Sequence, residues 1–169
     1  EAEADRLIAA AGDATGLLYP LAEALIERGL TVRGIRIGLR LQEVEERNPR
    51  LLRIVYPFPY RRLIESEARE RGVDPFLAAA LIRQESLFKA RIASPVGARG
   101  LMQVMPETGR GLASSAGIDG WDVELLYQPE INTHLGMGFV AEQMRRWNPS
   151  SPATRHARRD SGRPRRARS

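Results

Sequence analysis

Apolar residues recur at helical spacing along most of the chain, and no stretch alternates as a half-buried strand would. The pattern predicts helices over about 2–11 and 14–28, each followed by a glycine, and a third with Thr31 as its N-cap. Asn48-Pro49 and Asp74-Pro75 each pair a capping side chain with a proline at the first helical position. These signals favour an all-α fold.

Other features of the pattern are less regular. Pro20 lies inside the second predicted helix and indicates a kink or a division into two shorter helices. The third helix is expected to bury Ile35, Leu39, Leu41 and Val44. Further helices are predicted over about 60–72, from Pro75 onward, from Pro106 onward and over 130–147.

One carboxyl group interrupts an apolar helical stripe. In the segment LIRQESLF and the residues before it, Ala78, Leu81 and Ile82 share one side, and Glu85 takes the next position. A solitary Glu there is more often a boundary residue whose carboxylate reaches water. Alternatively, a carboxyl group on an apolar surface loses hydration of its charged form, holds a proton more readily and serves as a general acid. Glu85 by itself leaves both interpretations open.

A glycine-punctuated segment, SPVGARGLMQVMP, begins at Ser94. Gly97 and Gly100 suit tight turns or a close approach of backbone. Met102 can pack against neighbours, and Gln103 offers both a hydrogen-bond donor and an acceptor. Taken alone, this segment is more often a structural turn followed by a core helix with Met102 and Met105 inside than a binding loop.

Composition and charge exclude several classes of function. The chain has no cysteine, and its two histidines, at 134 and 156, match no metal-site spacing. No apolar run approaches the roughly 20 residues of a membrane-spanning helix. The net charge of +5 comes from residues 148–169, which hold seven arginines and one aspartate, whereas residues 1–147 are nearly neutral. That distribution argues against a nucleic-acid-binding body.

Together these motifs resemble the catalytic domain of the soluble lytic transglycosylases, a branch of the lysozyme-like superfamily. The matching stretches are Glu85-Ser86, the segment from Ser94 to Thr108, Pro129-Glu130-Ile131-Asn132 and Leu135-Gly136. A Glu-Ser pair alone is common, but this pair followed by GARGLMQVMP and Asn-x-x-Leu-Gly is specific. The resemblance covers about residues 57–147 and implies an all-α, lysozyme-like (goose-type-like) helical catalytic domain.

The resemblance also implies roles for individual residues. Glu85 would be the single catalytic acid/base. The substrate-binding residues would be Ser86, Ser94, Met102, Gln103 and Asn132. The substrate would be the peptidoglycan glycan strand, cut at the MurNAc-β-1,4-GlcNAc bond with formation of 1,6-anhydro-MurNAc and without a metal or organic cofactor. The expected location is the periplasm or cell envelope, although the sequence shows no export signal.

Four further side chains carry weaker expectations. Trp121 and Tyr127 either stack on sugar faces or anchor their loop on the core. Phe139 stands where the family often has Tyr, so a hydroxyl is missing if this position faces the cleft; core packing is the alternative. His134 is expected to face solvent.

The chain divides into three expected regions. Residues 1–56 resemble a helical linker or the end of an α-superhelical region, residues 57–147 form the catalytic domain, and residues 148–169 are a disordered basic tail by composition. The chain begins without Met, so we expect a processed form or a fragment of a longer protein. After Trp147 the family continues with an Ala-Tyr-Asn-Ala-Gly-Pro segment, which this chain lacks.

Two consequences follow from that missing segment. The abrupt loss of periodicity leads to the hypothesis of a frameshift shortly after Trp147, which translation of the other two reading frames would test. The domain would then be C-terminally incomplete. Two alternatives to the transglycosylase function therefore stay open: a lysozyme-type glycoside hydrolase on the same scaffold, and a non-catalytic peptidoglycan-binding module.

Overall fold

The computed structural model describes residues 2–12 and 14–147, and within them it is helical with no named strand. The elements are α1 (Ala2–Ala11), α2 (Thr15–Glu27), α3 (Thr31–Leu41), α4 (Pro49–Val55), α5 (Arg61–Arg71), α6 (Pro75–Ser86), α7 (Pro106–Ser115), the 3-10 helix η1 (Val123–Tyr127) and α8 (Pro129–Trp147). The all-α prediction is confirmed. The expected basic tail, residues 148–169, lies outside the described residues.

Local signals at the helix starts account for part of this arrangement. Asn48 caps α4 by accepting a 2.9 Å hydrogen bond from a first-turn amide, and the Asp74 carboxylate does the same at α6. The prediction that Thr31 caps α3 is wrong, because Leu30 is the N-cap residue and Thr31 is buried in the first turn. Helix α2 runs through Pro20 as one helix, so the predicted division into two pieces is also wrong.

The buried face of α3 differs from the one expected. Leu39 and Val44 are exposed, and the face is completed instead by Gly34 and Gly38. A β-carbon at Gly38 would lie 2.7 Å from the Ile54 side chain, which is too close for real packing. Helices α3 and α4 therefore approach each other closely because no side chain separates them at that point.

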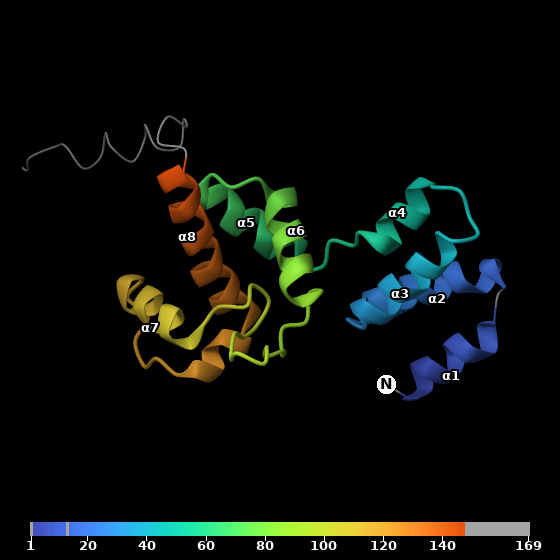
Figure 1. Ribbon diagram of the computed structural model, residues 1–169, viewed down its shortest axis with the longest axis horizontal. Coiled ribbons are helices and arrows are strands. Elements are labelled where there is room, and N and C mark those ends of the chain that lie inside the picture. Colours follow the sequence, from blue (N-terminus) through green and yellow to red (C-terminus); the bar gives the residue numbers. More distant parts are fainter. Residues whose placement is uncertain (1, 13, 148–169) are drawn as a thin grey trace, which may run out of the picture.

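Helices α1 to α4 form one group, called here the N-terminal unit (Figure 1). Its core is contributed by α2, α3 and α4 and consists of Leu18, Tyr19, Ala22, Leu25, Ile37, Leu41, Leu51, Ile54 and Val55. The Tyr19 hydroxyl also accepts a 2.9 Å hydrogen bond from the Asn48 side chain. The unit is thus closed around its own apolar interior.

Helices α5 to α8 and η1 form the second group, the C-terminal unit, on the other side of the molecule (Figure 1). Helix α8 packs against α5, α7 and η1. One core cluster joins α5, α6 and α8: Ile64, Ala68, Val73, Ala78, Ile82, Phe88, Leu101, Met137 and Ala141. A second joins α7, η1 and α8: Val104, Ala113, Leu126 and Leu135. In the described part of the chain no helix has the length and apolar character needed to cross a bilayer.

The two units meet at Arg83 on α6. Its Nη2 atom donates a 3.3 Å hydrogen bond to the Val55 carbonyl at the end of α4. Its guanidinium also lies 5.0 Å from the centre of the Tyr56 ring. The last turn of α6 is therefore tied to the N-terminal unit two residues before Glu85.

Candidate active site

Glu85 lies in the last turn of α6, beside the stripe that this helix buries. Ala78, Ile82 and Ser86 form the buried stripe, whereas Glu85 is exposed. The expectation that Glu85 sits on the apolar stripe is therefore wrong by one position. Ser86 is 4% exposed, and its hydroxyl donates a 3.1 Å hydrogen bond to the Ile82 carbonyl. Ser86 thus closes the end of α6 against the core and leaves the carboxyl group of Glu85 at the surface.

Glu85 lines a pocket of about 290 Å³ formed by α6, the turn before α7, α7 itself and α8. The other lining residues are Leu81, Met102, Gln103, Val104, Met105, Thr108, Leu112, Gly136, Phe139 and Val140. Most of these are apolar, and among the described residues that line the pocket Glu85 is the sole carboxylate. A ligand filling this pocket would displace water from an apolar surface next to one acid.

The chain leaves α6 through two consecutive residues in the left-handed conformation. Leu87 has φ of 50° and Phe88 has φ of 62°. Such conformations cost on the order of 1–3 kcal/mol each at a residue other than glycine, so the surroundings must hold them. Phe88 is 4% exposed in the core of the C-terminal unit, and its packing offsets that cost. Helix α6 consequently ends one residue after Glu85.

The glycine-punctuated segment forms the expected compact turn, but Met105 is 42% exposed at the N-cap of α7 and is not inside a core helix, and Met102 and Gln103 line the pocket. The Ser94 hydroxyl accepts a 3.0 Å hydrogen bond from the Ala98 amide. Isolated β-bridges join Arg99 to both Ala93 and Val104. Ser94 therefore holds the turn together and is not one of the residues that line the pocket.

Gln103 brings an amide into the pocket from a constrained backbone. Its φ is 49°, again left-handed. Its Nε2 atom donates a 2.8 Å hydrogen bond to the Gly100 carbonyl. Because a carbonyl oxygen can only accept, this contact orients the amide with its nitrogen toward the turn. The Oε1 atom is then the part of the amide that can accept a hydrogen bond from a ligand.

Asn132 lies in the first turns of α8 and is fully buried. Its Oδ1 atom accepts a 2.7 Å hydrogen bond from the Met102 amide. Its Nδ2 atom donates to the carbonyls of Arg99 and Leu126, each at 2.8 Å. The side chain thus joins α8, η1 and the turn before α7, and it does not line the pocket.

The structure separates the three aromatic candidates. Phe139 lines the pocket with Glu85, so the position does face the site, and it is 43% exposed. Trp121 packs against the core cluster of α7, η1 and α8 and anchors its loop. Tyr127 lies between two guanidinium groups, those of Arg91 at 5.5 Å and Arg99 at 5.2 Å from its ring centre.

His134 does not simply face solvent, which corrects that expectation. Its Nδ1 atom lies 2.8 Å from Nη2 of Arg71 and 3.2 Å from the Glu67 carboxylate. The three side chains link α5 to α8 on residues that do not line the pocket. Within residues 2–12 and 14–147, no cluster of three His, Cys, Asp or Glu residues is suited to hold a metal ion.

Three of the six predicted site residues come together and three do not. Glu85, Met102 and Gln103 line one pocket, from α6 and from the turn before α7. The other three predicted residues, Ser86, Ser94 and Asn132, make hydrogen bonds to backbone behind it.

The pocket also contains residues that the sequence did not single out for binding. Leu81 was interpreted as a core residue, although its spacing of four from Glu85 places both on one helix face. Gly136 and Val140 have the same spacing on α8, with Phe139 beside them. This spacing can be seen in the sequence, but the face of α8 that meets α6 is decided by tertiary packing.

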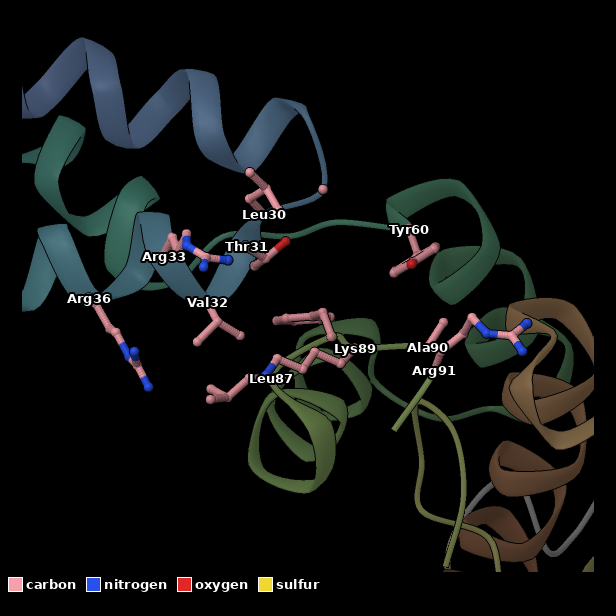
Figure 2. A pocket seen from close by; sticks show the side chains of 12 residues that line it. Leu30, Thr31, Val32, Arg33, Arg36, Tyr60, Leu87, Lys89, Ala90 and Arg91 are labelled. Atoms are coloured by element: carbon pink, nitrogen blue, oxygen red, sulfur yellow. The ribbon is translucent and has the colours of Figure 1, made fainter. Parts of the chain in front are cut away.

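A second, larger pocket of about 600 Å³ lies between the two units (Figure 2). The start of α3, Tyr60 and the segment 87–91 line it, and its charged residues are Arg33, Arg36, Lys89 and Arg91. Arg33 also pairs with Asp5 at 3.0 Å. Burial raises the pKa of the Tyr60 hydroxyl, and the charge of Glu130 adds to this effect. The pocket begins two residues after Glu85 and is basic, in contrast to the apolar pocket.

The fold and the site together define an all-α domain that has one carboxylate among the described residues lining an apolar pocket. The model of the transglycosylase SLT domain matches residues 62–157, which is more than half of the chain. The chain therefore belongs to the transglycosylase SLT domain family, which confirms the resemblance found in the sequence.

The curated relatives are transglycosylases by name. The chain is 30% identical over 112 residues to the soluble lytic murein transglycosylase of Escherichia coli K12, covering 66% of this chain and 16% of that protein. It is 36% identical over 84 residues to the membrane-bound lytic murein transglycosylase C of Actinobacillus pleuropneumoniae, covering 48% and 23%. A transglycosylase of Enterobacteria phage PRD1 is 31% identical over 90 residues, covering 53% and 31%. The chain thus corresponds to a small part of the cellular relatives.

Solved structures share the fold. The lytic transglycosylase Slt of Pseudomonas aeruginosa, solved as an inactive Glu-to-Gln mutant, superposes with a TM-score of 0.64 at 28% identity, covering 75% of this chain and 20% of that one. The 70-kDa soluble lytic transglycosylase of Escherichia coli gives a TM-score of 0.63 at 24% identity, with the same coverage. The lysozyme-like helical fold expected from the sequence is confirmed.

Proposed function

We propose that the pocket around Glu85 is the active site of a lytic transglycosylase acting on peptidoglycan. The reaction is cleavage of the MurNAc-β-1,4-GlcNAc bond with formation of 1,6-anhydro-MurNAc. The observation that carries this proposal is the position of Glu85, the one carboxylate among the described residues that line the pocket, within the residues matched by the family model. Most glycosidases place two carboxylates about the scissile bond, so one carboxylate suits a reaction in which the sugar supplies the second group.

In the proposed mechanism Glu85 transfers a proton twice. The protonated carboxyl group first donates to the glycosidic oxygen as the bond to the anomeric carbon breaks. The 2-acetamido group of MurNAc stabilises the positive charge that develops there, as in substrate-assisted glycosidases. The 6-hydroxyl of the same sugar then attacks the anomeric carbon and returns its proton to Glu85. The proton that Glu85 receives from the 6-hydroxyl replaces the one that it donated, so the reaction needs no water molecule.

The remaining walls of the pocket suit a sugar. Met102 and Phe139 offer apolar surface to the apolar face of a pyranose ring. The Oε1 atom of Gln103 can accept from a hydroxyl or an acetamido N–H, because its Nε2 atom is used by the Gly100 carbonyl.

The relatives support the same assignment of substrate and location. The names of the Escherichia coli and Actinobacillus relatives contain the word murein, and one of these enzymes is soluble and the other membrane-bound. A Glu-to-Gln mutant of the Pseudomonas relative is inactive. The proposal accordingly extends to a location in the cell envelope, with the periplasm as the expected compartment and peptidoglycan strands as the partner.

The proposal is tested by replacing the carboxyl group without changing its shape. Glu85→Gln should lower the rate of muropeptide release from purified peptidoglycan by about 10²–10⁴-fold, because it removes the transferable proton. Glu85 is exposed, so the thermal unfolding midpoint should not change. Glu107→Gln on α7 is the matched control, since Glu107 is also exposed and does not line the pocket. Equal release by Glu85→Gln and the unaltered chain would rule out the assignment.

A further inference from the structure

The hydrogen bonds of Asn132 account for every polar atom of its side chain. Oδ1 accepts from the Met102 amide, and Nδ2 donates to two carbonyls, with all three distances between 2.7 and 2.8 Å. The residue is 0% exposed. A primary amide has two donor hydrogens, and both are used here. No hydrogen of this side chain is left for a substrate.

Gly100 packs directly against this amide. It has φ of 78°, and a β-carbon added to it would collide with the Leu126 carbonyl oxygen and with Nδ2 of Asn132. The Leu126 carbonyl is itself an acceptor for Asn132. The backbone of the turn before α7 therefore approaches α8 as closely as it does because residue 100 lacks a side chain.

The contacts of this pair extend to two lining residues of the pocket. The Met102 amide donates to Asn132, and the Gly100 carbonyl accepts from the side chain of Gln103. Gln103 holds a left-handed backbone conformation, which persists only where its surroundings impose it. Asn132 thus holds Met102 by a hydrogen bond and packs against Gly100, and Gly100 holds Gln103 by a second hydrogen bond, so that α8 is connected to two residues that line the pocket with Glu85.

We propose that Asn132 and Gly100 form a positioning pair that fixes Met102 and Gln103 opposite Glu85. This assignment rests on the proposed function of the pocket and gives Asn132 a role other than binding substrate. Loss of the Asn132 amide removes the donor to the Leu126 carbonyl and the acceptor of the Met102 amide, whereas the Arg99 carbonyl keeps the Val104 amide as a donor. The loss of these two partners is unfavourable unless the turn moves. A small movement of the turn would shift the bound sugar relative to Glu85, and such misplacement lowers the rate of the chemical step.

The first measurement follows the turn itself and does not depend on activity. Asn132→Ala should speed hydrogen exchange at the Met102 amide by about tenfold or more, because that amide loses its acceptor. The Ala98 amide, which donates to the Ser94 hydroxyl in the same segment, should keep its protection. Unchanged exchange at Met102 would overturn the proposal.

The matched control is the neighbouring residue. Thr133 is also 0% exposed on α8, and its Oγ1 atom is buried without a hydrogen-bond partner in the described structure. Thr133→Val should leave both Met102 exchange and muropeptide release unchanged. If Thr133→Val reproduced the effects of Asn132→Ala, the pair would have no specific positioning role.

The second measurement separates positioning from substrate binding. In the otherwise unaltered chain, Asn132→Ala should lower kcat for muropeptide release by roughly 10- to 100-fold with KM within about threefold. In a Glu85→Gln background, adding Asn132→Ala should leave the affinity for a GlcNAc tetramer unchanged to within that factor. A large loss of affinity with kcat preserved would assign Asn132 to substrate binding instead. If the unaltered chain released no muropeptide, the proposed function would fail while the exchange measurement still decided the positioning role.

Discussion

The two units are both helical, yet they use unusual backbone conformations differently. In the described part of the N-terminal unit, left-handed residues are glycines such as Gly12 and Gly29, which end helices and have open space around them. In the described chain after α4, four residues other than glycine adopt that conformation: Tyr60, Leu87, Phe88 and Gln103. Gln103 lines the pocket with Glu85, and the other three line the basic pocket.

This difference separates the residues that make the fold from those that make the site. The N-terminal unit is held by its apolar core, to which its exposed ion pairs add little. In the C-terminal unit, residues other than glycine hold left-handed conformations that their surroundings must impose. Departures from local rules tend to gather at functional sites, and here one of them, Gln103, lines the same pocket as Glu85.

The largest effect in this comparison should come from Gly100 and Gly38, two of the glycines that have no room for a β-carbon. Gly100→Ala should lower the free energy of unfolding by roughly 2–4 kcal/mol, because its β-carbon meets a backbone carbonyl that cannot rotate away and its φ is positive. Muropeptide release should fall as well, since the turn carries Gln103. Chemical denaturation and release assays at a temperature where the variant is folded measure the two effects.

Gly38→Ala is the counterpart in the N-terminal unit. Its β-carbon would meet the side chains of Ile54 and Val55, which can adjust, so the expected loss of stability is about 1–3 kcal/mol. Release per folded molecule should be unchanged. If Gly38→Ala reduced release as much as Gly100→Ala does, the distinction between the two units would be wrong.

A smaller effect is expected from the aromatic wall of the pocket. Phe139→Ala removes apolar surface that a sugar ring would cover, which should raise KM for glycan strands by about tenfold, equivalent to roughly 1.4 kcal/mol. Met144→Ala on the same helix is a close control, because Met144 is 42% exposed and Phe139 is 43% exposed, but Met144 does not line the pocket. Equal KM values for the two variants would remove Phe139 from the binding surface.

The smallest effect concerns an ion pair of the N-terminal unit. A hydrogen bond from Arg50, supported by its charge, lowers the pKa of Glu23 in the folded protein. Its contribution to stability is therefore present above the unfolded pKa and is lost as the pH falls through the folded pKa. Glu23→Gln should be slightly less stable than the unaltered chain at neutral pH, and the difference should vanish in acid. Thermal melts across that range measure it, and a difference that grew in acid would contradict the sign.

Much of the fold was predictable because its signals are local. The Asn48-Pro49 and Asp74-Pro75 starts depend on neighbours in sequence, and the structure contains both caps. The buried face of α3 was not predictable in the same way. It depends on how closely α4 approaches Gly38, which is a property of tertiary packing.

The site, like the fold, was predictable only where its signals lie in the local sequence. The pairing of Glu85 with GARGLMQVMP pointed to Met102 and Gln103, and the pocket contains both. The sequence could not show that Ser86, not Glu85, continues the buried stripe, since both fit a helical period. The sequence also could not show that the Asn132 amide makes hydrogen bonds to three backbone groups, because those groups come from residues about 6 to 33 positions away.

The central claim is that Glu85 cuts a glycan strand with the sugar's own 6-hydroxyl as the nucleophile. The most direct measurement is the mass of the muropeptides released from purified peptidoglycan by the unaltered chain and by Glu85→Gln. The account predicts fragments whose muramic ends are one water lighter than hydrolysed reducing ends, and none of these from Glu85→Gln. Fragments with hydrolysed reducing ends would indicate a lysozyme-type hydrolase, and binding to peptidoglycan with no release from the unaltered chain would indicate a non-catalytic module; either result would contradict the account.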